Sequence, residues 1–247
     1  MLKSHINTPE ETERYMKDLK HWLEQAKDVP AEEMTDFFAK RIGEYEQVHL
    51  RHWAEEYGHI GDFFEDGLTT LLDIGCGTGL ELASLYRRFP QLKVTGIDLS
   101  DAMLDKLRAT YTDRDIEIIQ ADYFTYPFPP CRYDAALSFE TLHHFPYDQK
   151  QKIYEKLFQA IRPGGTYVEC DYIACCAEEE ALCLDSYRIR RDRSGIPADA
   201  FVHIDIPLTL DHQIELMEKA GFQTVDVLYQ NGGTAVIQAK KRQEGKD

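Results

Sequence analysis

Hydrophobic residues in the first quarter of the chain recur at helical spacing. Two groups follow this spacing of three or four positions: first Met34, Phe37, Phe38, Ile42 and Tyr45, and then Trp53, Tyr57, Ile60 and Phe64. This period is typical of helices with one buried face. Thr8, Pro9 and Glu11 form a helix start, with an N-cap, a first-turn proline and a capping-box acid. Residues 1–67 are therefore expected to form a helical N-terminal cap.

From residue 68 the pattern changes to an alternation of short apolar runs and helical runs. The strand-like runs are 69–74, 92–99, 115–121, 133–139 and 166–172, and the helical runs between them are 80–89, 101–111 and 148–161. Such an alternation predicts a parallel sheet covered by helices on both faces. A ligand is then expected at the carboxyl ends of the strands, near the point where the strand order reverses.

The C-terminal part of the chain predicts antiparallel strands instead. A helix over 210–220 ends at Gly221, and strand-like runs follow at 222–229 and 234–239. Gln230–Gly233 joins these two runs and contains an Asn-Gly pair, which is a strong hairpin signal. Residues 68–247 are expected to form one α/β domain, with an insertion at about 173–207 on the substrate side.

Composition narrows the classes of function. Of 247 residues, 44 are acidic and 28 are basic, and the net charge is -16. This charge disfavours binding to nucleic acid and to anionic membranes. The N-terminus lacks the apolar segment of a signal peptide, and no apolar stretch approaches the ~18 residues of a membrane helix. We therefore expect a cytoplasmic protein with no membrane partner.

The six cysteines favour reduced thiols over a disulfide framework, because none forms a C-x-x-C pair. Zinc ligation by the four later cysteines is disfavoured by their spacing. These are Cys170, Cys175, Cys176 and Cys183. We expect no metal site from the sequence.

The stretch "LLDIGCGTGLE" at 71–81 joins the first predicted strand to the first helix. Glycines at 75, 77 and 79 let the backbone turn sharply and approach a ligand closely. The stretch lacks the G-K-[ST] of a triphosphate loop, and Leu80 stands where a dinucleotide fingerprint has its third glycine. Asp73 would repel a pyrophosphate and attract an ammonium group. The loop therefore suits a ligand with a cationic amino acid end.

Two further acids lie at strand ends. Asp98 ends the second predicted strand, where a carboxylate can accept hydrogen bonds from both ribose hydroxyls. Ala121, Asp122 and Tyr123 follow the third strand, where an acid can accept from an adenine amino group and an aromatic ring can stack on the base. These positions indicate an adenosine-containing cofactor.

Taken together, these residues resemble the class I S-adenosylmethionine-dependent methyltransferases. The resemblance covers roughly residues 68–241. It rests on L-L-D-I-G-C-G-T-G at 71–79, G-I-D-L-S at 96–100, Q-A-D-Y at 120–123, Y-D-A-A-L-S at 133–138 and R-P-G-G at 162–165. It implies a Rossmann-like three-layer sandwich. The sheet would have seven mostly parallel strands and an antiparallel terminal hairpin, one strand of which is inserted between neighbours.

The resemblance also implies a cofactor, S-adenosylmethionine, with S-adenosylhomocysteine as its product, and assigns roles along the chain. The methionine part would lie among the residues of the glycine loop: Asp73, Gly75, Cys76, Gly77, Thr78 and Gly79. Asp98 would hold the ribose, and the adenine would lie among Leu99, Met103, Ala121, Asp122 and Tyr123. The sulfonium side would lie near Ser138 and Phe139, and Tyr45 would close over the cofactor. Structural alternatives exist for some of these residues: Met103 as ordinary helix core and Asp122 as a turn residue.

Methyl transfer needs a general base only if the nucleophile carries a proton at neutral pH. His143, in "SFETLHHFPYD" at 138–148, is the candidate, although the family often carries a similar L-H-H without using it as a base. Glu140 and Asp171 also lie at strand ends and are open to a structural role.

The acceptor site is expected between the N-terminal helices and the 173–207 insertion. The insertion holds one cationic cluster, Arg188, Arg190, Arg191 and Arg193. These arginines would either bind an anionic substrate or pair with Glu178, Glu179, Glu180 and Asp185 on a solvated helix. A small-molecule acceptor is the leading hypothesis; the oligomeric state is open, and a dimer is compatible with the sequence.

A more specific resemblance is to the carboxy-S-adenosylmethionine synthases of wobble-uridine tRNA modification. Those enzymes use an arginine in the last helix to hold the extra carboxylate of their cofactor, and Glu215 stands at that position here. A glutamate would repel the carboxylate, so the ordinary cofactor is favoured. The remaining alternatives are a tRNA-modifying relative, a non-catalytic cofactor-binding domain and, last, a nicotinamide oxidoreductase.

Overall fold

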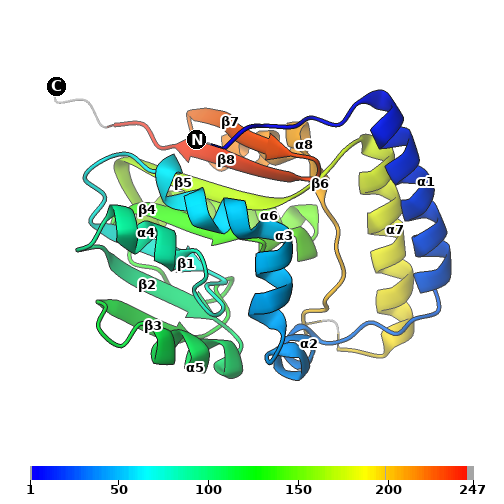
Figure 1. Ribbon diagram of the computed structural model, residues 1–247, viewed down its shortest axis with the longest axis horizontal. Coiled ribbons are helices and arrows are strands. Elements are labelled where there is room, and N and C mark those ends of the chain that lie inside the picture. Colours follow the sequence, from blue (N-terminus) through cyan, green and yellow to red (C-terminus); the bar gives the residue numbers. More distant parts are fainter. Residues whose placement is uncertain (1, 198, 244–247) are drawn as a thin grey trace.

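The computed structural model describes residues 2–197 and 199–243. Its centre is a mixed sheet with the strand order β3-β2-β1-β4-β5-β8-β7 (Figure 1). The strands are β1 (Thr70–Ile74), β2 (Lys93–Asp98), β3 (Ile116–Gln120), β4 (Tyr133–Phe139), β5 (Ile161–Ala174), β7 (Thr224–Asn231) and β8 (Thr234–Lys240). The first five are parallel, and β8 is antiparallel to both of its neighbours, β5 and β7. A two-residue strand, β6 (Leu208–Thr209), extends the end of β5.

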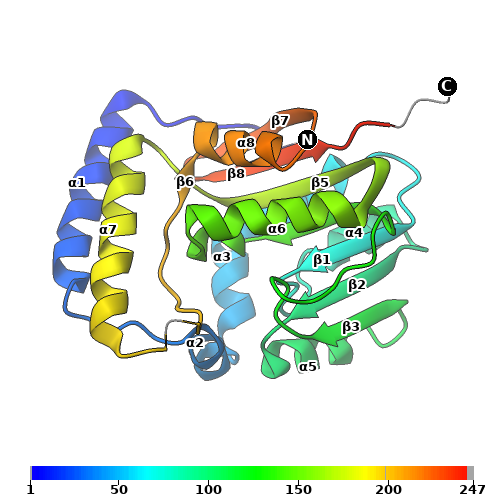
Figure 2. The same ribbon diagram turned by 180° about the vertical axis from the view of Figure 1, so that it is seen from behind.

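Helices cover both faces of the sheet. One face carries α3 (Tyr45–His59), the short helix η1 (Ile60–Phe63), α4 (Leu82–Arg88) and α5 (Asp101–Thr110), and the opposite face carries α6 (Tyr147–Ala160) and α8 (Leu210–Lys219) (Figures 1 and 2). Strand alternation divides the core accordingly. In β1, Leu71 packs with Leu82 of α4, whereas Leu72 packs with Leu157 of α6.

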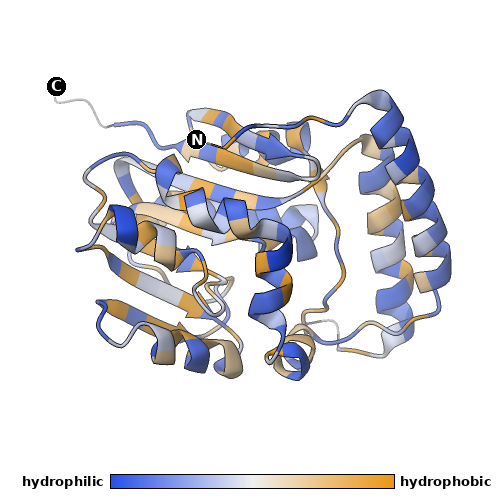
Figure 3. Cartoon of the chain, viewed as in Figure 1, coloured by the Kyte–Doolittle hydropathy of each residue, from blue (hydrophilic) through white to orange (hydrophobic). Residues whose placement is uncertain are grey.

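Two long helices lie side by side beyond the carboxyl end of β5: α1 (Pro9–Ala26) and α7 (Ala177–Ser194) (Figures 1 and 2). Most of α1 is hydrophilic (Figure 3). The pair is joined to the sheet through the buried Glu179, which accepts hydrogen bonds from the hydroxyls of Tyr15 in α1 and Tyr172 in β5. A third N-terminal helix, α2 (Met34–Arg41), follows α1 and lies near the carboxyl ends of the parallel strands.

The predicted Rossmann-like sandwich and its antiparallel terminal hairpin are confirmed. The capping box at Thr8 and Glu11 is present, and Asn231 pairs with Thr234 across the predicted turn. The fifth strand begins earlier than predicted, at Ile161, because Ile161 pairs with Tyr133 of β4; the R-P-G-G segment forms an irregularity before pairing resumes at Thr166. Among the described residues, no helix is long and apolar enough to cross a bilayer.

Candidate functional site

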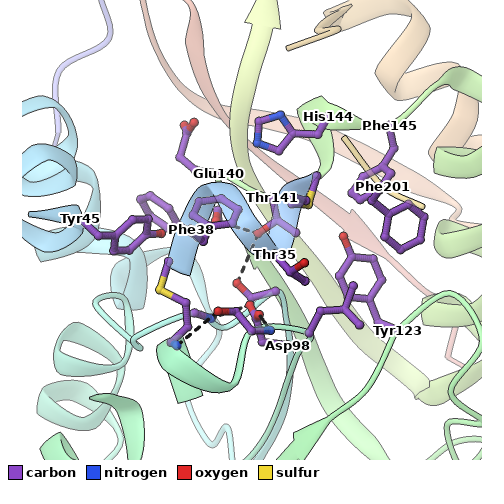
Figure 4. A pocket seen from close by; sticks show the side chains of 17 residues that line it. Thr35, Phe38, Tyr45, Asp98, Tyr123, Glu140, Thr141, His144, Phe145 and Phe201 are labelled. Atoms are coloured by element: carbon purple, nitrogen blue, oxygen red, sulfur yellow. Dashed lines mark hydrogen bonds between the residues drawn. The ribbon is translucent and has the colours of Figure 1, made fainter. Parts of the chain in front are cut away.

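A cavity of about 620 Å³ lies at the carboxyl ends of β1, β2 and β4 (Figure 4). This is the edge of the sheet where the strand order reverses, because β1 has β2 on one side and β4 on the other. The lining residues are Met34, Thr35, Phe38, Tyr45, Gly75, Gly77, Asp98, Leu99, Ser100, Met103, Tyr123, Phe139, Glu140, Thr141, His144, Phe145 and Phe201. They come from the glycine loop, the ends of β2 and β4, the N-terminal helices and the segment after α7.

The three loop glycines have positive φ angles but serve different purposes. A Cβ at Gly75 would lie 2.4 Å from Cγ2 of Thr141, and one at Gly79 would lie 2.3 Å from Cδ1 of Leu107. Both positions require glycine for close packing. A Cβ at Gly77 would meet nothing nearer than the Tyr45 hydroxyl, at 3.7 Å. Gly77 therefore leaves its backbone open to the cavity.

Asp98 joins the glycine loop to the helix that follows β2. Its carboxylate accepts from the Gly77 amide at 3.1 Å and from the Ser100 amide at 2.7 Å. Burial raises the pKa of Asp98 above its usual value, although the hydrogen bonds from these two amides act in the opposite direction. Ser100 in turn caps α5 by accepting from the Met103 amide. Asp98 is thus held in place at the cavity wall by protein donors alone.

A second acidic group lies buried beside the loop. Asp73 Oδ2, Thr78 Oγ1 and Glu81 Oε1 are buried oxygens for which the protein supplies no hydrogen-bond partner. Burial raises the pKa of Asp73 well above its usual value, with the Glu81 carboxyl adding to the effect, and burial raises the pKa of Glu81 to about 7. Buried acceptors without donors favour a ligand that brings N–H groups, and cationic ones best.

Glu81 was missed by sequence reasoning, although a signal was present. It lies between Leu80 and Leu82, at a position where the helical period calls for a buried side chain. An acid at such a position is either paired or functional.

At the end of β4 the chain bends sharply into the cavity wall. Glu140 has a φ of 48°, an angle that few residues other than glycine adopt, and its amide donates to the Cys170 carbonyl at 2.8 Å. Its side chain is only 3% exposed, and Oε1 has no partner within the protein. Burial raises the pKa of Glu140 well above its usual value, although the nearby His143 acts against this.

The two histidines after β4 differ in position. Nδ1 of His143 donates to Asp171 Oδ1 at 2.5 Å, and His143 does not line the cavity. Burial lowers the pKa of His143, but the Asp171 carboxylate outweighs this and raises it to about 9. His144 does line the cavity, and its Nδ1 lies 3.1 Å from Asp205 Oδ1. The catalytic role of His143 stays a prediction, and its position is behind the cavity wall.

The other predicted cofactor residues divide into two groups. Those that line the cavity are Tyr45, Gly75, Gly77, Asp98, Leu99, Met103, Tyr123 and Phe139; those that do not are Asp73, Cys76, Thr78, Gly79, Ala121, Asp122 and Ser138. The Ser138 hydroxyl is fully buried and hydrogen-bonded to the Tyr167 hydroxyl at 2.7 Å. Asp122 accepts from the Phe124 amide at 2.8 Å, which is the turn role considered above, and it borders an adjacent pocket.

A cover closes the cavity on the side opposite the glycine loop. It consists of α2 and residues 199–206, and these two segments bind each other directly. The Met34 amide donates to the Phe201 carbonyl at 3.0 Å, and Glu33 forms a bridge with Val202. The ring of Phe201 packs edge-on against Phe145. Sequence reasoning placed the acceptor site between these regions but did not identify Met34, Phe145 or Phe201, because their contacts link distant parts of the chain.

The arginine cluster of α7 binds backbone carbonyls near the start of this cover. Arg190 donates to Val29 O at 3.2 Å, Arg193 to Lys27 O at 2.9 Å, and Arg191 to Pro197 O at 2.6 Å. Arg188 pairs with Asp185, as one of the two sequence interpretations expected. The rest of the cluster secures the turn after α1 and the turn after α7.

The charge of the cavity wall is one-sided. Its lining includes Asp98 and Glu140, and no arginine or lysine of the described residues is part of it. Glu215 of α8 pairs with Lys219 and is half exposed, away from the cavity. Glu215, which aligns with an arginine of the carboxy-S-adenosylmethionine synthases, therefore does not face this site.

Comparison with known proteins gives consistent matches. A family model described as a methyltransferase domain matches residues 71–165. The carboxy-S-adenosyl-L-methionine synthase of Chromohalobacter salexigens is 28% identical over 203 residues, which cover 76% of this chain and 69% of the relative. An uncharacterized methyltransferase of Mycobacterium tuberculosis is 31% identical over 107 residues, 43% of this chain, and the match spans about half (52%) of that relative's length.

Among solved structures, human N-acetylserotonin methyltransferase in complex with S-adenosylmethionine superposes with a TM-score of 0.66. It is 17% identical, and the match covers 94% of this chain and 66% of that one. This likeness concerns the fold.

Proposed function

We propose that this chain, an S-adenosylmethionine-dependent methyltransferase of the class I fold, methylates a small molecule bound beneath its cover. The observation that carries the proposal is the cavity beneath the cover, which brings Gly77, Asp98 and Tyr123 together with the apolar side chains of the cover. A concave, mostly apolar site with a few polar groups is typical of pockets for small molecules. The net charge of -16 also disfavours a nucleic-acid acceptor.

The residues around the cavity fit the cofactor. Asp73 and Glu81 would accept from the ammonium of the methionine part, since their buried oxygens have no protein donors. Asp98 would accept from the ribose hydroxyls, and its carboxylate is already oriented by two amides. Leu99, Met103 and Tyr123 would surround the adenine. The cofactor supplies an activated methyl group, whose leaving group is a neutral thioether.

The chain's own task is then to align the acceptor and to exclude water. Phe38, Phe145 and Phe201 supply an apolar wall on the cover side. Glu140 and His144 are the polar side chains on the wall beyond β4, and they are the groups placed to orient an acceptor or to take its proton.

Mass spectrometry of the small molecules that co-purify with the protein tests the cofactor assignment. S-adenosylmethionine or S-adenosylhomocysteine is the expected result, and a nicotinamide dinucleotide would contradict it. A labelled methyl donor incubated with a metabolite extract and with bulk tRNA tests the acceptor class. Label is expected in the metabolite fraction, and label in tRNA alone would overturn the small-molecule proposal.

A second candidate, carboxy-S-adenosylmethionine synthesis, is favoured by the match to the Chromohalobacter salexigens enzyme over 76% of this chain. The acidic lining of the cavity opposes it, because Asp98 and Glu140 would face the additional carboxylate. The same mass spectra separate the two activities, since the carboxylated cofactor is heavier. A non-catalytic cofactor-binding protein would bind the donor and label neither pool.

A further inference from the structure

Two histidines and an aspartate meet at the edge of the cavity, beside the cover. His143 and His144 follow β4, and Asp205 comes from the segment that returns after α7. One ligand atom from each of the three lies within 4.8 Å of the others. Asp205 Oδ1 is 3.1 Å from His144 Nδ1 and 3.8 Å from His143 Nε2. Ligand atoms around a tetrahedral zinc ion are separated by about 3.3 Å, so the two distances to Asp205 are within about half an ångström of those in a metal site.

Asp171 orients His143 for this role. Its carboxylate accepts a hydrogen bond from His143 Nδ1 at 2.5 Å, which leaves Nε2 on the side of Asp205, where a metal ion can replace the proton of that nitrogen. A carboxylate behind a histidine is the usual support of a metal-binding imidazole, because it fixes both the tautomer and the ring orientation.

His144 faces the carboxylate of Asp205. Its side chain is 4% exposed, and Nδ1 makes no hydrogen bond although Asp205 Oδ1 lies 3.1 Å away. A buried ring nitrogen facing a carboxylate without a hydrogen bond is a ligand atom available to a shared cation.

The three groups are held by the backbone. The Ile206 amide donates to the His143 carbonyl at 2.7 Å, which ties the Asp205 segment to the turn after β4. The Leu142 amide donates to Asp171 at 2.9 Å and fixes the same turn to β5. The cluster is therefore assembled before any ion binds.

We propose that His143 Nε2, His144 Nδ1 and Asp205 Oδ1 bind a divalent transition-metal ion, with zinc as the best-fitting ion. Two imidazoles and one carboxylate are a donor set for Zn²⁺ and for related ions such as Fe²⁺, and three protein ligands leave a coordination position open. Because His144 also lines the cavity, the bound ion would lie at the cavity wall. Given the proposed function, the ion would hold an oxygen or nitrogen atom of the acceptor.

Metal content tests the site without reference to activity. The untagged protein is dialysed against a chelator, reloaded with zinc chloride and separated from free zinc. The zinc bound per protein molecule is then measured by elemental mass spectrometry. We expect one equivalent of zinc in the wild type, and at least tenfold weaker zinc binding in Asp205→Asn and in His144→Gln. Asp205→Asn is nearly isosteric at a half-exposed side chain, so it is expected to fold normally.

His212→Gln is the matched control, because His212 also contacts a carboxylate, Glu180, but lies outside the cluster. It should keep the full zinc equivalent. Less than a tenth of an equivalent in the wild type, or equal zinc affinity in the wild type and Asp205→Asn, would overturn the proposal. Stabilisation of Asp205→Asn by S-adenosylhomocysteine is measured in parallel, so that loss of the metal site and failure of the cofactor assignment are distinguished.

Discussion

The acids around the glycine loop differ in what they already bind. Asp98 accepts from two protein amides, whereas Asp73 and Glu81 have buried oxygens with no donor from the protein. Asp98 thus shapes the loop before any ligand arrives, and the other two keep acceptors free for one. This difference leads to separate predictions for the two parts of the site.

Replacing Asp98 with Ala should abolish the thermal stabilisation that S-adenosylhomocysteine confers. The variant loses the proposed ribose acceptor and the link between Gly77 and Ser100, and charge-assisted hydrogen bonds of this kind are worth about 1.5–3 kcal/mol each. Asp101→Ala is the control, because Asp101 is exposed and contacts only Arg108. Undiminished stabilisation in Asp98→Ala would mean that the ribose lies elsewhere.

Cofactor binding should strengthen as the pH rises from 5.5 to 7. The pKa of Glu81 is raised to about 7, so near pH 6 this carboxyl is largely protonated and must lose its proton to face an ammonium. Release of one proton predicts an increase of about tenfold per pH unit below the pKa. For the unliganded protein the sign is reversed: a raised carboxyl pKa lowers the free energy of unfolding as the pH rises over the same window.

Calorimetric titration with S-adenosylhomocysteine in buffers of different protonation enthalpy measures both the affinity and the proton release. Glu81→Gln should bind more weakly, with a flatter pH dependence. An affinity for the wild type that does not change between pH 5.5 and 7 would contradict the placement of the ammonium.

At the scale of the element, the β1–α4 loop uses its glycines for two purposes. Gly79 packs closely against Leu107 of α5, whereas Gly77 faces the cavity. The spacing of the glycines in the sequence did not distinguish these purposes, because the distinction depends on Leu107 and Tyr45, which come from other elements.

Alanine substitutions at Gly79 and at Gly77 should have different effects on stability and on cofactor binding. Gly79→Ala places a methyl group 2.3 Å from Leu107 Cδ1 at a φ of 76°, so it should lower the free energy of unfolding by about 2–4 kcal/mol. Gly77→Ala meets no such clash and should cost about 1 kcal/mol from its backbone angle. Its methyl group should instead weaken cofactor binding more than tenfold. Urea unfolding and calorimetry measure these effects, and equal stability losses in both variants would contradict the distinction.

The parts of the fold predicted from the sequence are those whose signals are local. The sheet, the hairpin and the loop follow from periodicity, turn residues and glycines within short windows. The cover and the histidine cluster were not resolved to residues, since Met34 meets Phe201, and His143 meets Asp205, across long stretches of chain. Glu81 is an intermediate case. Its apolar neighbours in the sequence indicate a buried position, but only the structure shows that its Oε1 atom has no hydrogen-bond donor.

At the scale of the whole molecule, the two halves of the cover are held together by local contacts near the surface. The Met34 amide donates to the Phe201 carbonyl, Glu33 forms a bridge with Val202, and the ring of Phe37 stacks on His203. No side chain of α2 is fully buried. Local opening at low free-energy cost is the expected behaviour of such a segment.

Hydrogen exchange should therefore slow in the cover when S-adenosylhomocysteine binds. We expect the amides of Met34 and His203 to gain protection, because they donate across the cover to the carbonyls of Phe201 and Glu32, while amides in β7 stay unchanged as an internal reference. Mass spectrometry of peptides from labelled protein measures this. Protection confined to the glycine loop would show that the cover does not respond to the cofactor.

The two halves of the cover lie on opposite sides of the matched methyltransferase domain in the sequence. A change of side chains in one half alone would leave the stacked pair of Phe37 and His203 without one of its rings. We therefore expect α2 and residues 199–206 to change together when the acceptor changes. Exchanging both segments with those of a relative, and not either segment singly, is the route by which acceptor preference can be transplanted onto an unchanged donor site.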